Sequence, residues 1–137
     1  MGIVSSVAEP VFFLENTYDE AYSLLIESRE FMEHTVPEYR KRVTQLQRLM
    51  LTKETMRLTT RLTQIMAWLL TQKAVHLEQL APTKAMQSAY RLGGQKVCMD
   101  LGDGDQEILP AQLRSLLSRS YDLYVRINRL DQQLAAK

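Results

Sequence analysis

The chain has 137 residues, of which 45% are hydrophobic and 24% are charged, so it is long and apolar enough to form one domain with its own core. The formal net charge of +1 disfavours nucleic acid as a partner, and no apolar run approaches the roughly 20 residues that a membrane-spanning helix needs. A single cysteine cannot form an internal disulfide, which favours a cytoplasmic location.

The N-terminal region predicts an arm followed by a helix. Residues 1–16 are expected to be extended, with Phe12 and Phe13 as an apolar anchor that is a candidate for docking on a partner. Thr17 then opens a capping-box pattern, in which its hydroxyl accepts a hydrogen bond from the backbone and a glutamate three residues later reaches back. The first helix is therefore predicted over about residues 17–34.

The second helix has two possible starts. Thr35 and Glu38 repeat the capping-box spacing, and the proline between them is tolerated in a first turn because its missing N–H would have no helical partner there. Thr44 is the alternative start, with a loop before it. We expect the helix over about residues 38–80, where Pro82 ends it.

The C-terminal part predicts a loop and one more long helix. A short helix is expected over residues 83–92, and residues 93–109 are predicted to be a loop because they contain four of the five glycines and an acidic run. The last helix is predicted over about residues 110–135, where apolar residues recur in a heptad-like stripe typical of a helix that packs antiparallel to its neighbours. The acidic residues of the loop are candidates for partner docking: Asp103, Asp105 and Glu107.

These elements predict an all-α fold, an antiparallel three-helix bundle over residues 17–137 with a long central helix. No glycine occurs from Ile3 to Leu92, so the turn residues that a β-rich fold needs about every 8–12 positions are missing. The central helix has apolar residues such as Met56 and Leu70 on more than one face. Because one three-helix bundle cannot cover them all, we expect a homodimer.

The residues that usually carry chemistry do not form a recognisable pattern. His34 and His76 lie on different predicted helices, and neither has a second metal-binding residue one turn away. Cys98 has no histidine partner that would make it a nucleophile. The sequence therefore predicts no catalytic residues, no metal site and no cofactor.

Two arginines in the predicted central helix allow two readings. Arg57 and Arg61 share one helix stripe with Glu54 and Trp68 through steps of three and four residues. The pair could hold a dianion, as a helical-bundle enzyme or a small-anion receptor would, or it could form ion pairs with the aspartates of the last helix. Burying an arginine without a partner is costly, so we favour the paired structural network. Those aspartates are Asp122 and Asp131.

The sequence also resembles a known family. Residues 54–62 (ETMRLTTRL), 67–70 and 73–75 resemble the central helix of the alphaproteobacterial RcdA family, named for the regulation of CtrA degradation. A second region of resemblance lies in the last helix, and the two together cover roughly half of the chain. The resemblance marks core and ion-pair residues in both helices: Glu54, Arg57, Arg61, Trp68, Tyr124, Arg126 and Asp131.

The resemblance implies a function that composition and spacing do not show. Proteins of this family are adaptors in cell-cycle proteolysis without enzymatic activity. They bridge the ClpXP protease, primed by the response regulator CpdR, to substrates such as the transcription factor CtrA, and some substrates require PopA as well. The family's fold is a dimeric three-helix bundle, and its members are recruited to the cell pole. We therefore expect a cytoplasmic adaptor.

Overall fold

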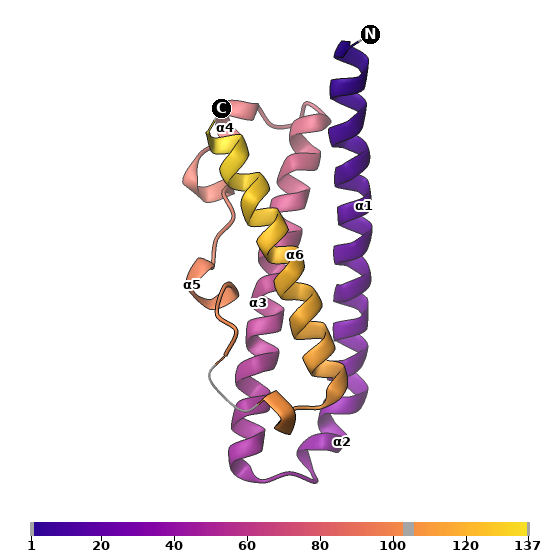
Figure 1. Ribbon diagram of the computed structural model, residues 1–137, viewed down its shortest axis with the longest axis vertical. Helices are drawn as coiled ribbons and strands as arrows, with labels where there is room; N and C mark the ends of the chain where they lie inside the picture. The colour runs from indigo at the N-terminus through magenta and orange to yellow at the C-terminus, as the bar shows by residue number, and fades with distance from the viewer. Residues whose placement is uncertain (1, 103–105, 137) are drawn as a thin grey trace.

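The computed structural model describes the backbone of residues 2–102 and 106–136 and the side chains of residues 14–102 and 107–136. Over these residues the fold is built on three long helices, α1 (Gly2–Glu30), α3 (Gln45–His76) and α6 (Ala111–Ala135), which lie side by side in Figure 1. The described residues contain no strand, so the predicted all-α bundle is confirmed. None of the helices described is both long enough and apolar enough to cross a membrane.

The directions of the helices differ in part from the predicted antiparallel bundle. Figure 1 shows α1 running against both other long helices, whereas α3 and α6 run the same way. Arg61 of α3 contacts Leu117 of α6, and Trp68, further along α3, contacts Asp131, further along α6. The parallel arrangement is possible because the connection over residues 77–110 is long enough to return along the bundle.

Helix α1 begins at Gly2, so the extended arm over residues 1–16 and the helix start at Thr17 are wrong. Thr17 is buried inside the helix instead of capping its end. A capping pattern is a short-range signal, and a helix continues through it when the residues before it also hold helical geometry. Between Gly2 and Glu30 no further glycine interrupts the backbone, and the helix continues through Pro10, although a proline removes one backbone hydrogen bond and its ring crowds the carbonyl four residues before it.

The junction between α1 and α3 decides between the two predicted starts of the second helix. The chain continues from α1 through a π-helical turn, η1 (Phe31–Thr35), into the short α2 (Val36–Arg40). The capping box is at Thr44: its hydroxyl accepts from the Gln47 N–H at 3.2 Å, and the Gln47 side chain accepts from the Thr44 N–H at 2.9 Å. Thr35 makes no side-chain cap. Helix α3 therefore starts at Gln45, and the predicted start at residue 38 is wrong.

Helix α3 ends at His76, before the predicted end near residue 80. Glu78 has a φ of 59°, in the left-handed region. The Gln79 N–H donates to the Ala74 carbonyl at 2.9 Å and the Glu78 N–H donates to the Val75 carbonyl at 3.1 Å, which is the pattern of a Schellman cap. The left-handed position is usually a glycine, and because it is a glutamate here, the next stop signal in the sequence is Pro82, which accounts for the later predicted end.

The connection over residues 77–110 runs back along α3 and contains short helical turns. The short helix predicted over residues 83–92 is in fact two separate turns, and the predicted loop over residues 93–109 contains two more. Gly94 is required by geometry, since its φ is 72° and a Cβ atom there would lie 3.1 Å from the Cys98 Sγ. The turns are α4 (Pro82–Ala85), η2 (Ser88–Tyr90), α5 (Gln95–Cys98) and η3 (Gln106–Ile108).

The core lies between the three long helices. The heptad-like stripe predicted for the last helix is confirmed, because α6 buries a residue at every third or fourth position. Burial of each large apolar side chain contributes about 1.5–3 kcal/mol. The buried residues of α6 are Leu113, Leu116, Leu117, Ser120, Leu123, Tyr124, Ile127 and Asp131. All of them except Ser120 and Asp131 lie in one hydrophobic cluster with Leu58, Leu62, Ile65 and Leu69 of α3 and with Ala21 and Leu24 of α1.

Candidate functional site

Glu54, Arg57 and Asp100 form an ion-pair network between α3 and the segment that follows α5. Glu54 and Arg57 lie one turn apart and are each 5% exposed. The Arg57 Nη1 donates to both Glu54 oxygens, at 2.5 and 2.6 Å, and its Nη2 donates to Asp100 Oδ2 at 3.2 Å. The Gly102 N–H, which donates to Asp100 Oδ1 at 2.8 Å, lowers the pKa of the Asp100 carboxyl, and the Arg57 charge lowers it further.

Arg61 lies one turn further along α3 and is 1% exposed. Its three nitrogens donate to backbone carbonyls: Nε to Cys98 at 2.8 Å, Nη2 to Asp100 at 2.7 Å and Nη1 to Leu117 at 3.0 Å. The guanidinium also lies 5.2 Å from the centre of the Tyr121 ring. Burial lowers the pKa of Arg61. The side chain thus ties the connection to α3 and α6 through peptide groups.

The two arginines are therefore bound to protein groups and do not face an open pocket together. Arg57 is held by carboxylates through both of its Nη groups, while its buried Nε has no hydrogen-bond partner among the described residues, and Arg61 is held by carbonyls. The suggested pairing of these arginines with Asp122 or Asp131 of the last helix is wrong, because the carboxylates come from α3 itself and from the connection. The arrangement favours a structural network over an anion site.

Trp68 and Asp131 form a second buried cluster, further along α3 and α6. The Trp68 Nε1 donates to Asp131 Oδ1 at 2.9 Å. Arg91, from the connection, donates through Nε to both Asp131 oxygens, at 2.9 and 3.0 Å. Sequence reasoning missed Arg91 and Asp100 as partners because both lie outside the periodic segments, where no spacing rule marks a residue.

Tyr124 and Arg126 lie apart from these clusters. The Tyr124 hydroxyl donates to the Gly93 carbonyl at 2.7 Å, and burial raises the pKa of Tyr124. Arg126 is on the surface, where it forms an ion pair with Glu20 of α1. The seven residues that the resemblance marks thus form two buried networks, one buried hydrogen bond and one surface ion pair. They hold the bundle together and do not converge on one site.

The predicted docking residues fall mostly outside the described side chains. Phe12 and Phe13 belong to α1 by their backbone, but their side chains are outside the described part, as are Asp103 and Asp105. Glu107 lies in η3 and is exposed. Their role in docking stays a prediction.

An apolar stripe on the outer face of α3 has no cover in the described part of the chain. Its residues are between 49% and 66% exposed, although large apolar side chains usually avoid such positions when they are grouped. Consecutive members of this set are three residues, or a multiple of seven residues, apart in the sequence. This spacing places them along one side of the helix, opposite its buried face. We call this set the outer stripe: Leu46, Leu49, Met56, Leu70 and Leu77.

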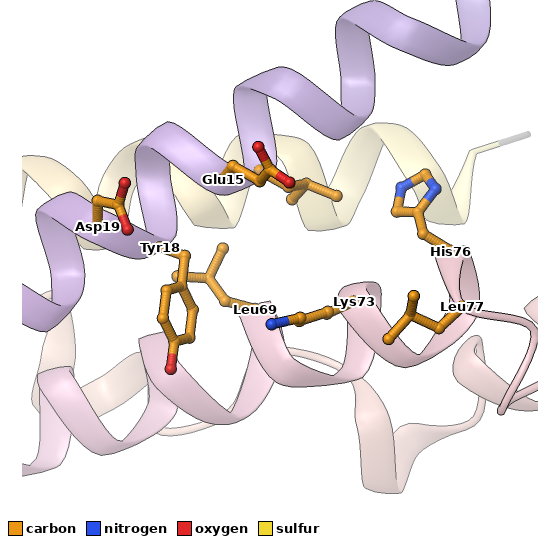
Figure 2. A pocket seen from close by; sticks show the side chains of 8 residues that line it. Glu15, Tyr18, Asp19, Leu69, Lys73, His76 and Leu77 are labelled. Carbon is orange, nitrogen blue, oxygen red and sulfur yellow. The ribbon is translucent and has the colours of Figure 1, made fainter.

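A pocket of about 330 Å³ opens between α1 and α3, near the C-terminal end of α3 (Figure 2). Its walls are mainly apolar, formed by Leu14, Tyr18, Leu69 and Leu77. The Lys73 side chain lies along α3, with its ammonium nitrogen 5.5 Å from the centre of the Tyr18 ring. The arrangement is a short hydrophobic trough between two antiparallel helices.

The rim of this pocket carries charged side chains from both helices. Glu15 and Asp19 lie on the α1 side, and Lys73 and His76 lie on the α3 side, as Figure 2 shows. An apolar floor with a polar rim is the usual composition of a protein-binding or ligand-binding site. Sequence reasoning did not identify the pocket, because its residues come from two helices about 50 residues apart in the chain.

Comparisons with known proteins agree with the fold. A model of the family described as "Protein of unknown function (DUF1465)" matches residues 7–137. Among solved structures, the chain is similar to RcdA from Caulobacter crescentus CB15, with a TM-score of 0.73 and 30% sequence identity. The match covers 90% of this chain and 92% of that one. No curated protein matches the chain.

Proposed function

We propose that this chain, which belongs to the DUF1465 family and is an RcdA-like protein, acts as a non-enzymatic adaptor in regulated proteolysis. The likeness to RcdA over 90% of the chain carries the proposal. By its resemblance to the RcdA family, the chain bridges the ClpXP protease, with CpdR, to substrates such as CtrA, and PopA is a further partner. It acts in the cytoplasm and is recruited to the cell pole.

The physical task of an adaptor is to raise the concentration of a substrate next to its protease. Two modest contacts on one rigid body convert the second binding step into an intramolecular one, which increases avidity by about 10²–10⁴. The bundle suits this task because ion pairs and buried networks join its helices. Arg119 of α6, for example, binds Glu27 of α1 through two bonds of 2.7 and 2.8 Å.

The outer stripe supports a homodimer as part of the proposal. A second copy of the chain that packs on this face would cover the exposed apolar side chains of α3 and leave the polar surfaces of α1 and α6 for other proteins. A C2 pairing of two such stripes is self-complementary, since each copy presents the same residues.

A reconstituted degradation reaction tests the adaptor function. Purified ClpXP, CpdR and CtrA are incubated with ATP, with and without the chain, and the half-life of CtrA is followed by gel electrophoresis. We expect the chain to shorten the half-life by about tenfold or more at concentrations where CtrA alone is poorly recognised.

Two controls sharpen this reaction. Omission of CpdR should abolish the acceleration, and an unrelated helical protein of similar size should have no effect. If the half-life of CtrA is the same with and without the chain, the adaptor function is refuted.

The alternative of an anion receptor or enzyme finds no support in the geometry of Arg57 and Arg61. Dicarboxylates and phosphates should therefore leave the melting temperature of the protein unchanged. A rise in melting temperature that Arg57→Gln abolishes would favour the receptor instead.

A further inference from the structure

The pocket between α1 and α3 has a charge pattern that its own side chains do not neutralise. Glu15 and Asp19 lie one turn apart on α1, both exposed, and neither forms an ion pair with any residue that the structure describes. Like charges at this spacing destabilise a helix. The ammonium of Lys73 is on the opposite side, over the Tyr18 ring. The α1 rim is therefore an acidic edge along an apolar trough.

The size and shape of the pocket favour side chains of a polypeptide. A cavity of about 150 Å³ holds a benzene molecule, so a volume of about 330 Å³ accepts one or two large apolar side chains. The trough lies between two antiparallel helices, where another helix can align its own apolar face. Tyr22 and Leu25 extend the α1 wall away from the pocket and are 49% and 38% exposed.

We propose that this pocket docks a basic amphipathic helix of a partner protein. An apolar side chain of that helix enters between Leu14, Leu69 and Leu77, and lysine or arginine residues on its flank pair with Glu15 and Asp19. The proposal rests on the adaptor function above and names the chemistry of one partner contact. The pocket differs from the outer stripe in the partner that it fits. The pocket requires a basic partner, whereas a second copy of the chain would bring its own acidic edge against the first and be repelled.

Binding of a designed peptide tests the proposal directly on the full chain. The probe is a fluorescein-labelled amphipathic peptide with leucines on one face and lysines along one flank, and its matched control has glutamates in place of the lysines. Fluorescence anisotropy at low salt should give an affinity for the lysine peptide about tenfold higher than for the glutamate peptide. Added salt should reduce this difference, because the rim is exposed.

Variants of the protein locate the binding. Glu15→Gln together with Asp19→Gln should lower the affinity for the lysine peptide about tenfold and should not lower the affinity for the glutamate peptide, because like-charge repulsion is removed. Leu77→Asn should weaken both peptides. Leu46→Asn is the matched control, since Leu46 is a similarly exposed member of the outer stripe but does not line the pocket, and it should leave the affinity for both peptides unchanged.

Three results would overturn the proposal. The first is that the wild-type protein does not bind the lysine peptide, and the second is that it binds both peptides equally. The third is that Leu46→Asn weakens peptide binding as much as Leu77→Asn does. A fourth is unchanged binding of the lysine peptide in Leu77→Asn, which would show that the peptide does not enter the pocket.

The degradation reaction separates this proposal from the adaptor function. If the wild-type chain accelerates CtrA turnover but shows none of the peptide binding above, the pocket proposal fails and the adaptor function stands. If the peptides bind as expected while the chain leaves CtrA turnover unchanged, the adaptor function fails and the basic docking site stands.

Discussion

Individual buried residues in this protein join distant parts of the chain through polar bonds. Arg61 does so most completely, because its three nitrogens bind carbonyls of α5, of the following segment and of α6. Of the three carbonyls, that of Leu117 also accepts from the Ser120 hydroxyl at 3.0 Å, whereas those of Cys98 and Asp100 belong to the connection. A buried arginine with this many partners contributes to the order of the connection, which has few regular backbone hydrogen bonds of its own.

Replacement of Arg61 measures that contribution. Arg61→Met should lower the free energy of unfolding by about 3 kcal/mol, since it removes three charge-assisted bonds to carbonyls that tie the connection to α3 and α6. The matched change Arg119→Met removes a half-exposed ion pair with Glu27 and should cost less than about 1 kcal/mol. Urea denaturation followed by circular dichroism gives both values. Equal losses in the two variants would show that the Arg61 bonds add nothing beyond a surface pair.

At the scale of the elements, helix ends are set by local side-chain and backbone bonds. Besides Thr17, two threonines have the capping spacing in the sequence, Thr35 and Thr44, and of these two only Thr44 caps a helix in the structure. At the other end of α3, Glu78 takes the left-handed conformation that closes the helix. Both the Thr44 cap and the Glu78 conformation can be tested by single substitutions.

The two threonines make a matched pair. Thr44→Ala should destabilise the protein by about 1 kcal/mol because it removes the side-chain bond to the Gln47 N–H. Thr35→Ala should have an effect below about 0.5 kcal/mol, since Thr35 makes no cap bond. Thermal unfolding of the two variants checks this, and a larger loss for Thr35→Ala would contradict the assigned start of α3.

Glu78 offers a stabilising change. Glu78→Gly should raise the free energy of unfolding by about 0.5–1 kcal/mol, because glycine adopts the left-handed conformation without the steric cost of a Cβ atom. Glu78→Ala keeps that cost and should bring no gain. The urea midpoints of the two variants decide the matter, and a loss of stability in Glu78→Gly would be inconsistent with the Schellman cap.

At the scale of the whole molecule, the outer stripe sets the expected assembly. Light scattering should give a mass of about 32 kDa, twice the 15.9 kDa of one chain. Leu49→Lys with Met56→Lys should reduce it to that of one chain, because two charges would be buried in the interface. Leu134→Lys, on α6, is the control and should remain dimeric. A wild-type protein with the mass of one chain would refute the dimer.

The sequence by itself determined the helical class, the buried stripe of α6 and the glycine-rich character of the connection. These features depend on spacings of three and four residues and on the absence of glycine, which are local properties of the chain. It also indicated that Arg57 and Arg61 would be paired, because an unpaired buried charge is costly whatever the fold.

Only the tertiary structure decided the direction of α6, the partners of the buried arginines and the pocket between α1 and α3. Arg57 meets Asp100 across 43 residues and Arg91 meets Asp131 across 40. No local spacing encodes such pairs, since they form only after residues 77–110 fold back along α3. The same return of the chain makes α6 parallel to α3, so α1 alone runs antiparallel to both, and the acidic edge of the pocket lies on its surface.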